Sequence, residues 1–416
     1  MPRPEMHGVV VIGAGHAGVE AAASLRAGGY SGPVTVVGAE RHLPYQRPPL
    51  SKEMLADGGD PGALALRSEA FFADRGIVLR HGPAVDVDRA RQQVHIAGDR
   101  PLDYDHLVLA TGAAPRRIEL PGRSLRGVAE LRTLDDALAL RASLVGAGRM
   151  VVLGGGFIGM EVASAARKRG VDVSVVELAD RLLGRAVSPP VSAAVAAHHR
   201  ADGVGLCFGE HATELVGDAG HVTGVRTGSG RVLPADLVVL GIGATAEDGL
   251  ARRAGLATDG GVLVDRWLTT SDPRIIAIGD CAVVCDPATG TRRRLESIQN
   301  ATDHGRYAAA RILGEERPYC ALPWFWSNQG ALRLQLVGIA GDSAELVVRG
   351  DAARFSVFCM RDGRLTAVES VNDPGTHMAA RRLLERATPG EAELVAVDYD
   401  VRALARRVLA RETAVA

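Results

Sequence analysis

Short, continuous apolar runs recur along the chain, and several of them stop at a glycine. Val9–Ile12 and Met150–Leu153 are the first members of two such series. Runs of this kind are typical of strands buried on both faces of a parallel sheet, since such strands do not alternate apolar and polar positions. After each of these two runs the pattern becomes helical, over Val19–Ala27 and Met160–Arg169. The sequence therefore predicts two strand–turn–helix units.

Further apolar runs predict the neighbouring strands of both units. They are Val34–Val37, Ile77–Leu79, Val94–Ile96, Leu107–Leu109, Val173–Val176, Leu237–Leu240 and Ile275–Ile278. From about Leu322 onwards apolar and polar positions alternate, which predicts an antiparallel sheet followed by a helical tail. We expect an α/β protein with two Rossmann-like nucleotide-binding domains and a smaller α+β C-terminal domain.

Each strand–turn–helix unit contains a glycine motif of the dinucleotide-binding type. Its first glycine permits a tight turn, its second lets backbone N–H groups approach a pyrophosphate, and its third lets helix and strand pack closely. The candidate cofactor-binding residues are Gly13, Gly15, His16, Ala17 and Gly18 in the first motif, and Gly154, Gly156, Phe157, Ile158 and Gly159 in the second. Two such motifs in one chain indicate two dinucleotides and electron transfer between them.

An acidic residue at the end of the second strand of such a unit accepts hydrogen bonds from the adenosine ribose. In the second unit this residue is Glu177, whose carboxylate repels a 2′-phosphate, so we expect NADH rather than NADPH. Arg181 lies close enough along the chain to leave NADPH open. In the first unit the strand ends at Ala39 and Glu40, and Glu40 is the available carboxylate.

Composition excludes several other classes of protein. A net charge of −1 argues against a general binder of nucleic acid or of membrane surfaces. No apolar stretch approaches the roughly 20 residues needed to span a bilayer, and Met1–Gly8 leads directly into the first predicted strand. The five cysteines form neither a CxxC pair nor a disulfide framework, and no metal site is expected. We expect a cytoplasmic protein.

Several longer motifs together resemble one branch of a known family. Most specific is the proline-rich segment from Pro44 to Lys52, where we expect Ser51 to cap a helix that begins at Lys52. The other matching segments are Ala110–Gly112, Leu131–Asp136, Gly279–Asp280, Glu296–Asn300 and Pro323–Gln329. With the two glycine motifs, they resemble FAD-dependent pyridine-nucleotide oxidoreductases, and among them NADH-dependent ferredoxin reductases that serve haem monooxygenases and Rieske dioxygenases.

The resemblance implies an assignment of cofactors and domains. The first glycine motif would hold FAD tightly, and the second would bind NADH as a co-substrate. Both nucleotide domains would be of the glutathione-reductase type. The FAD domain would be split into residues 1–112 and 245–321, with the NAD domain at 113–244 between its parts and a C-terminal α+β domain at 322–416.

The resemblance also implies roles for single residues. Lys52 would lie beside the flavin ring, Glu161 would face it near the nicotinamide, and Trp326 would lie at the flavin edge where electrons leave. An alternative for Glu161 is a surface position in the first turn of a helix, favoured by the helix dipole. Asp280 would bind the ribityl chain of FAD, and the Ile298 backbone would meet its pyrimidine edge. The other expected cofactor contacts are Arg47, Ala84, Ala110, Thr111, Gly112, Arg132, Gly243, Gly279 and Ser297.

The expected partner is a small two-iron two-sulfur ferredoxin, bound transiently through charge, by a monomer or homodimer. Basic candidates for its docking are Arg292, Arg293, Arg294, Arg306 and Arg311. Two alternatives remain: an NADH-dependent reductase of a small acceptor such as a quinone, a radical or oxygen, and a redox-sensing flavoprotein. Residues 41–60 contain no cysteine, which argues against disulfide reductases of this superfamily.

Three segments depart from the family pattern. Ala39 stands where many relatives have an acid, Ala244–Asp248 lacks the usual proline–asparagine pair, and Asn328 and Gly330 follow the tryptophans in place of an aspartate and a bulky residue. The last two departures leave the choice of acceptor open.

Overall fold

The computed structural model describes residues 7–285, 290–340 and 345–415, and the chain divides into two compact units. The first unit comprises Met1–Gln46, Asp60–Ala114 and Ala244–Ala321. The second comprises Arg47–Gly59, Pro115–Gly243 and Leu322–Ala416.

The first unit contains a five-stranded parallel sheet with the strand order β19-β7-β1-β2-β3. Its strands are β1 (Val9–Ile12), β2 (Val34–Gly38), β3 (Ile77–His81), β7 (His106–Leu109) and β19 (Ile275–Ala277). All four residues of β1 are buried, as expected for a central strand covered on both faces. The predicted strands of this sheet are therefore confirmed.

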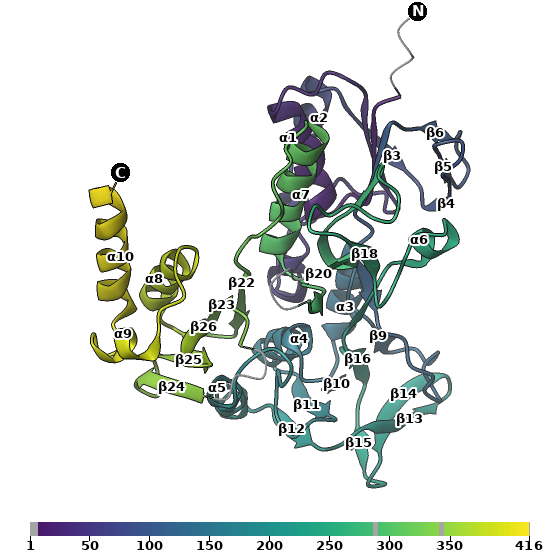
Figure 1. The fold of residues 1–416 in the computed structure, drawn as a ribbon. Coiled ribbons are helices and arrows are strands. Elements are labelled where there is room, and N and C mark those ends of the chain that lie inside the picture. The colour runs from purple at the N-terminus through teal and green to yellow at the C-terminus, as the bar shows by residue number, and fades with distance from the viewer. Residues whose placement is uncertain (1–6, 286–289, 341–344, 416) are drawn as a thin grey trace, which may run out of the picture. The chain divides into compact units, whose positions relative to one another are not determined.

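Two helices of the first unit lie side by side, although they are far apart in the sequence (Figure 1). They are α1 (His16–Ala27) and α7 (Ile298–Ile312). Close packing is possible because Gly305 of α7 faces the backbone of α1 at Ala17 and Ala21. This pairing brings the start of α7 close to the glycine motif at the start of α1.

Smaller elements complete the first unit. Its other helices are α2 (Glu69–Asp74), α6 (Gly249–Arg253) and the 3₁₀ helices η3 (Pro61–Leu64) and η4 (Gly279–Cys281). Its other strands are β4 (Ala84–Asp88), β5 (Gln93–Ile96), β6 (Leu102–Asp103), β17 (Ala244–Ala246), β18 (Val262–Val264), β20 (Ala282–Cys285) and β21 (Arg292–Arg293), while β8 (Ala113–Pro115) ends one residue beyond the unit.

The second unit contains another mostly buried parallel sheet, with the strand order β12-β11-β10-β16-β9. Its strands are β9 (Val128–Ala129), β10 (Arg149–Leu153), β11 (Asp172–Glu177), β12 (Gly205–Phe208) and β16 (Leu237–Leu240). The helices of this part are η1 (Pro48–Ser51), η2 (Glu53–Leu55), α3 (Leu134–Leu144), α4 (Phe157–Lys168) and α5 (Pro189–Ala201). A separate antiparallel sheet consists of β13 (Ala212–Asp218), β14 (His221–Thr227) and β15 (Val232–Pro234).

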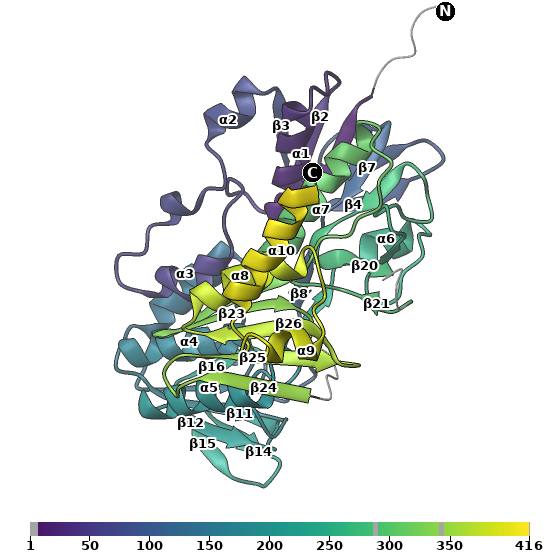
Figure 2. The same ribbon diagram turned by 60° about the vertical axis from the view of Figure 1, so that its left-hand side comes forward.

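The second unit also contains a five-stranded antiparallel sheet with the order β22-β23-β26-β25-β24. The strands are β22 (Trp324–Gln329), β23 (Leu332–Gly338), β24 (Glu345–Gly350), β25 (Phe355–Arg361) and β26 (Arg364–Val371). Helices α8 (Pro374–Leu384), α9 (Glu391–Val395) and α10 (Val401–Val415) follow it, and Figure 2 shows α8 and α10 running next to each other beside this sheet. The α/β fold class, with two Rossmann-like sheets and a C-terminal α+β part, is confirmed.

Two expectations about local structure are wrong. Helices α1 and α4 begin at His16 and Phe157, three residues before the predicted starts, because the last residues of each glycine motif already form the first helical turn. Ser51 does not cap a helix. It ends the 3₁₀ helix η1, whose two prolines fix the backbone of a short turn, and its side chain bonds elsewhere.

Candidate functional site

The glycine motif of the first unit forms a tight turn between β1 and α1. A Cβ at Gly18 would clash with the carbonyl oxygen of Gly13, so only glycine lets the helix start this close to the strand. A Cβ at Gly15 would meet nothing within 4 Å, and α1 begins without a side-chain cap. The backbone N–H groups of His16 and Ala17 thus lie at a helix N-terminus that can accept a pyrophosphate.

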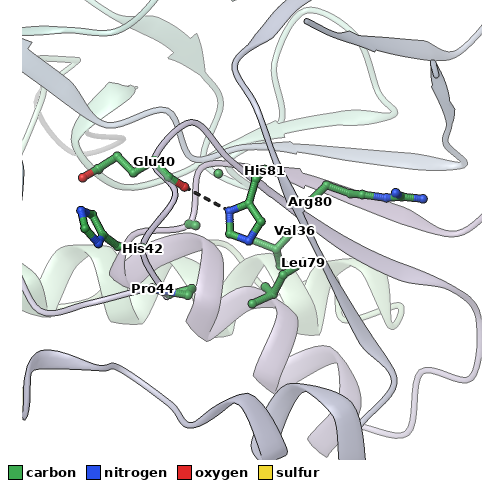
Figure 3. A pocket seen from close by; sticks show the side chains of 9 residues that line it. Val36, Glu40, His42, Pro44, Leu79, Arg80 and His81 are labelled. Carbon is green, nitrogen blue, oxygen red and sulfur yellow. Dashed lines mark hydrogen bonds between the residues drawn. The ribbon is translucent and has the colours of Figure 1, made fainter. Parts of the chain in front are cut away.

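Beside this turn lies a small pocket, at the carboxyl ends of β2 and β3 (Figure 3). The lining residues are Ala14, Val36, Gly38, Glu40, His42, Pro44, Leu79, Arg80 and His81. Figure 3 shows the His81 ring turned towards the Glu40 backbone, whose carbonyl oxygen lies 3.1 Å from Nδ1. The Glu40 carboxylate accepts a hydrogen bond of 2.5 Å from the Tyr45 hydroxyl.

The pocket lies where a fold of this type would receive the adenosine of a dinucleotide, and it is therefore a candidate adenosine site. Glu40 lines it, whereas the neighbouring Ala39 is exposed and is not among its lining residues. Of these two residues only Glu40 lines the pocket, so Glu40 remains the candidate for a contact with the ribose. His42 and His81 also line the pocket, and neither was predicted because a lone histidine carries no motif.

The other FAD candidates of the first unit gather at the same edge of its sheet. β7 and β19 flank one another, so Ala110, Thr111 and Gly112 follow one strand where Gly279 and Asp280 follow the next. Gly279 N donates to His304 Nδ1 at 3.0 Å, and the Thr111 hydroxyl donates to the Glu247 carbonyl at 2.6 Å. The departing segment Ala244–Asp248 is therefore anchored to this turn.

Two further candidates of this unit lie at the ends of elements. Ser297 caps α7, its hydroxyl accepting from Asn300 N at 3.1 Å, so Ile298 begins that helix. Ala84 is the first residue of β4, in the small antiparallel sheet. A cradle of glycine turns, two helix N-termini and an adenosine pocket fits a dinucleotide such as FAD.

The glycine motif of the second unit repeats this geometry between β10 and α4. A Cβ at Gly159 would clash with the carbonyl oxygen of Gly154, and one at Gly156 would meet nothing within 4 Å. The Glu177 carboxylate is held beside this turn, since Oε2 accepts from Gly155 N at 2.6 Å and Oε1 from Ala179 N at 2.8 Å. The motif therefore fits a second dinucleotide.

Four more residues were considered for the second dinucleotide site, Arg181, Phe157, Ile158 and Gly243. Arg181 donates to the carbonyls of Val187 and Gly184, at 2.8 and 2.6 Å, so its guanidinium is engaged within its own loop. Phe157 and Ile158 open α4, and Ile158 is 47% exposed despite being apolar. Gly243 follows the turn after β16, where its backbone has φ +104°.

Lys52 and Glu161 meet in the second unit. The Lys52 ammonium lies 2.7 Å from Glu161 Oε2, and the same oxygen accepts a 2.5 Å hydrogen bond from the Ser51 hydroxyl. Lys52 also donates to the Pro48 carbonyl at 3.2 Å. Glu161 is only 7% exposed, so the alternative of a surface glutamate in the first helical turn is wrong.

The second oxygen of Glu161 is bound by Ser327, a residue for which the sequence predicted no role. Ser327 on β22 donates to Glu161 Oε1 at 2.6 Å, and Gln329 Nε2 donates to the Ser327 hydroxyl at 2.8 Å. His199 Nε2 lies 3.3 Å from the Gln329 amide oxygen. Burial lowers the pKa of His199 to about 4, so its ring is neutral at pH 7. Ser327 and Gln329 lie within the matching segment Pro323–Gln329, but the sequence indicated no contact between them and Glu161 or His199, which are 166 and 130 residues away.

The remaining candidates of the second unit are held near one another in pairs. Arg47 donates to the Arg132 carbonyl at 2.7 Å, and Arg132 N donates to Asp136 at 3.0 Å, just before α3. On β22, the Trp326 ring stacks on Trp324, with ring centres 5.5 Å apart.

Three of the five arginines considered for partner docking form ion pairs with acidic side chains. Arg292 lies 3.0 Å from Asp259, and Arg294 lies 2.5 Å from Glu296. Arg306 lies 2.7 Å from Glu20. These ion pairs reduce the net positive charge that these arginines present, so they remain candidates only.

Three negative findings concern the described residues. Cys207, Cys281, Cys320 and Cys359 are free thiols there. Among residues 7–285, 290–340 and 345–415, no cluster of three or more histidine, cysteine, aspartate or glutamate side chains is arranged to hold a metal ion. Within the same ranges no helix is long and apolar enough to cross a membrane.

Comparison with known proteins places the chain in a family. A family model described as pyridine nucleotide-disulphide oxidoreductase matches residues 7–305, and one described as reductase C-terminal matches residues 324–405. These matches define the class, an FAD-dependent oxidoreductase that uses NAD(H). The chain belongs to the pyridine nucleotide-disulphide oxidoreductase family.

Within this family the chain is similar to several ferredoxin reductases. It is 45% identical to rhodocoxin reductase of Rhodococcus erythropolis over 403 residues. The matched region covers 96% of this chain and 94% of that protein. The ferredoxin reductase for the CYP199A2 system from Rhodopseudomonas palustris superposes with a TM-score of 0.93 at 42% identity, covering 96% of this chain and 100% of that chain. Putidaredoxin reductase, in its covalent complex with putidaredoxin, gives a TM-score of 0.87 at 38% identity, covering 90% and 92%. The resemblance inferred from the sequence motifs is confirmed.

Proposed function

We propose that this chain is the NADH-dependent reductase of a small two-iron two-sulfur ferredoxin that serves a haem monooxygenase or a Rieske dioxygenase. The observation that carries this proposal is the likeness, over nearly the whole chain, to a ferredoxin reductase of known structure. The complex of putidaredoxin reductase with putidaredoxin supports an iron–sulfur protein as the partner.

When bound, FAD would supply the redox chemistry, namely two-electron exchange with NADH and one-electron exchange with an iron–sulfur protein. The protein's part is to bind and orient. We assign FAD to the motif at Gly13 and NADH to the motif at Gly154, with the FAD domain at residues 1–112 and 245–321, the NAD domain at 113–244 and the C-terminal domain at 322–416. The ion pair between Lys52 and Glu161 supports a role for both residues at the reacting flavin and nicotinamide rings. The stacking of Trp326 on Trp324 supports a role for Trp326 where electrons leave the flavin.

Binding of NADH rather than NADPH is supported by the arrangement around Glu177. Its carboxylate is fixed by two backbone N–H groups, whereas Arg181 is bound to two carbonyls of its own loop. A 2′-phosphate would therefore meet a fixed negative charge. We place the enzyme in the cytoplasm, where NADH and ferredoxins are available, as a monomer or homodimer.

The test is a reconstituted relay with the purified holoenzyme. We expect NADH to reduce the flavin and the flavin to reduce a two-iron two-sulfur ferredoxin faster than free flavin does. Because docking by charge is screened over roughly 10 Å at 0.1 M salt, ferredoxin turnover should fall steeply as salt is added. Turnover of a neutral quinone measured in parallel controls for salt effects on the flavin itself.

Two results would contradict this proposal. Salt-insensitive turnover with a quinone or oxygen, and none with ferredoxin, would favour a reductase of small acceptors. Flavin reduction without turnover of any acceptor, together with a change of oligomeric size, would favour a redox sensor.

A further inference from the structure

One face of strand β22 is docked onto the start of helix α4. Alternate residues of a strand point to the same side, and here Phe325, Ser327 and Gln329 all contact that helix. The Phe325 ring lies 4.6 Å from the ring of Phe157, and Gln329 Nε2 donates to the Phe157 carbonyl at 3.3 Å. Between them, Ser327 reaches the Glu161 carboxylate at 2.6 Å. The C-terminal sheet thus supplies a hydrogen bond to a residue that we place at the reacting rings.

Only one acceptor is available to the hydrogen of the Ser327 hydroxyl. A serine hydroxyl carries a single hydrogen and can also accept hydrogen bonds. Gln329 Nε2 donates to this oxygen at 2.8 Å, so the hydroxyl hydrogen is left for Glu161 Oε1. Gln329 Nε2 also donates to the Phe157 carbonyl at 3.3 Å, and because a carbonyl can only accept, this contact fixes the amide nitrogen on the side that faces Ser327. Ser327 is only 1% exposed, so water cannot easily replace it.

The two oxygens of Glu161 are thereby divided between two sources. Oε1 accepts from Ser327, while Oε2 accepts from Ser51 and pairs with Lys52. A buried carboxylate that loses a donor will turn towards other donors, since an unsatisfied buried charge is unfavourable. Such a rotation would displace the Lys52 ammonium, because it is bound to the same group.

We propose that Ser327 is a positioning residue, which fixes the Glu161 carboxylate and, through it, the Lys52 ammonium for hydride transfer from NADH. The inference rests on the proposed function, since it assumes that Lys52 and Glu161 act at the flavin and nicotinamide rings. It adds a residue from the C-terminal sheet to the reductive step, acting through the carboxylate of Glu161.

The first experiment compares Ser327→Ala with Ser327→Thr and with Ser370→Ala. Ser370 is a matched control: it is 2% exposed, lies in the same sheet, and bonds to the Ser356 hydroxyl at 2.9 Å rather than to Glu161. Flavin reduction by NADH is followed by stopped flow without any acceptor. We expect Ser327→Ala to lower the limiting rate about tenfold, the usual effect of losing a hydrogen bond to a charged group.

The dissociation constant of NADH should change little in Ser327→Ala, because no contact with the dinucleotide motif is removed. Ser327→Thr keeps the hydroxyl and should restore most of the rate, while Ser370→Ala should match the wild type. Equal rates in Ser327→Ala and Ser370→Ala, with a wild type that NADH does reduce, would overturn the inference.

The second experiment is a double-mutant cycle on unfolding by denaturant, which does not depend on turnover. Ser327→Ala is made in the wild type and in Glu161→Ala, and the free energies of unfolding are compared. We expect Ser327→Ala to destabilise the wild type more than the Glu161→Ala variant, since its partner is gone in the latter. Additive effects would overturn the inference. A wild type that NADH does not reduce would instead overturn the proposed function, and this cycle would still decide whether Ser327 holds Glu161.

Discussion

At the scale of single residues, Glu177 shows how the backbone can aim a carboxylate. Each of its oxygens accepts one backbone N–H, from Gly155 and from Ala179. A carboxylate can accept about four hydrogen bonds, so capacity remains for the hydroxyls of a ribose. Arg181 is the nearby cation that could have favoured NADPH. Two of its N–H groups instead donate to the carbonyls of Gly184 and Val187. The local geometry thus favours the unphosphorylated cofactor.

A substitution of Glu177 should change this preference. We expect Glu177→Ala to lower kcat/KM for NADH by about 10- to 100-fold, because hydrogen bonds from the ribose to a charged group are lost. For NADPH, kcat/KM should rise, since the repulsion of its 2′-phosphate is removed. Both values are measured with a one-electron dye as acceptor. Glu214→Ala is the control, because Glu214 pairs with Arg226 at a half-exposed position on β13. An unchanged NADH-to-NADPH ratio in Glu177→Ala would contradict this account.

At the scale of elements, the sequence predicted buried strands well and contacts between elements poorly. Strand β1 has the predicted bounds, since a continuous apolar run leaves little choice of structure. Helix α5 was not predicted, because Pro189 and Pro190 resemble a loop, although proline also suits the first turn of a helix. The turn Pro48–Ser51 was mistaken for the approach to a capped helix. The partner of Ser51 is Glu161, 110 residues away, and no local pattern encodes that contact.

The candidate site shows the same difference: features set by local backbone geometry could be predicted from the sequence, and features set by long-range contacts could not. The glycine motifs and their acids could be found from the sequence because backbone geometry demands those residue types at fixed spacings. Ser327 and His199 could not, because their roles follow from the tertiary packing of β22 against α4 and α5. The resemblance to a family supplied Lys52 and Trp326, which spacing alone would have left unnoticed.

A second contact between elements joins the C-terminal sheet to helix α5. Glu369 on β26 is 1% exposed, and its carboxylate accepts from Ser188 N at 2.9 Å and from the Ser188 hydroxyl at 2.5 Å. Ser188 immediately precedes α5, so Glu369 satisfies a backbone donor at the start of that helix. Burial raises the pKa of Glu369, while the bonds from Ser188 and the charge of Arg181 act in the opposite direction.

This raised pKa predicts a pH dependence of stability. The folded chain binds a proton at Glu369 more tightly than the unfolded chain, so stability falls as pH rises from the unfolded pKa, near 4.5, through the folded one. Glu369→Gln cannot titrate and should lack this contribution, whose slope is at most about 1.4 kcal/mol per pH unit. Unfolding by denaturant is measured across this pH range for both proteins. Subtracting the stability profile of Glu369→Gln from that of the wild type removes the contributions of groups that both proteins share, such as His199. A difference that does not depend on pH would contradict the raised pKa of Glu369.

At the scale of the whole molecule, the two glycine motifs have the same local geometry, but we assign them different roles in cofactor binding. In the first unit the motif lies beside the pocket lined by Glu40 and at the same sheet edge as the turns at Gly112 and Gly279, so these parts could contact a cofactor from several sides. In the second unit the motif has Glu177 beside it and an exposed Ile158 at the start of the helix. The first arrangement suits permanent retention of a dinucleotide, and the second suits repeated exchange.

A pair of matched substitutions separates these two roles. In both Gly18→Ala and Gly159→Ala the new methyl group collides with a carbonyl oxygen of its own glycine turn, so the local disturbance is the same in kind. We expect Gly18→Ala to lose most of its flavin on purification, and its reduction by NADH to fall in proportion to the flavin lost. Gly159→Ala should keep the flavin, and the dissociation constant of NADH should rise about tenfold or more, as expected for lost backbone contacts to a charged pyrophosphate. Flavin absorbance per chain and stopped-flow titration with NADH give the two quantities. Loss of flavin from Gly159→Ala, or full flavin with weakened NADH binding in Gly18→Ala, would reverse the assignment of the motifs, because each cofactor should follow the glycine turn that holds its pyrophosphate.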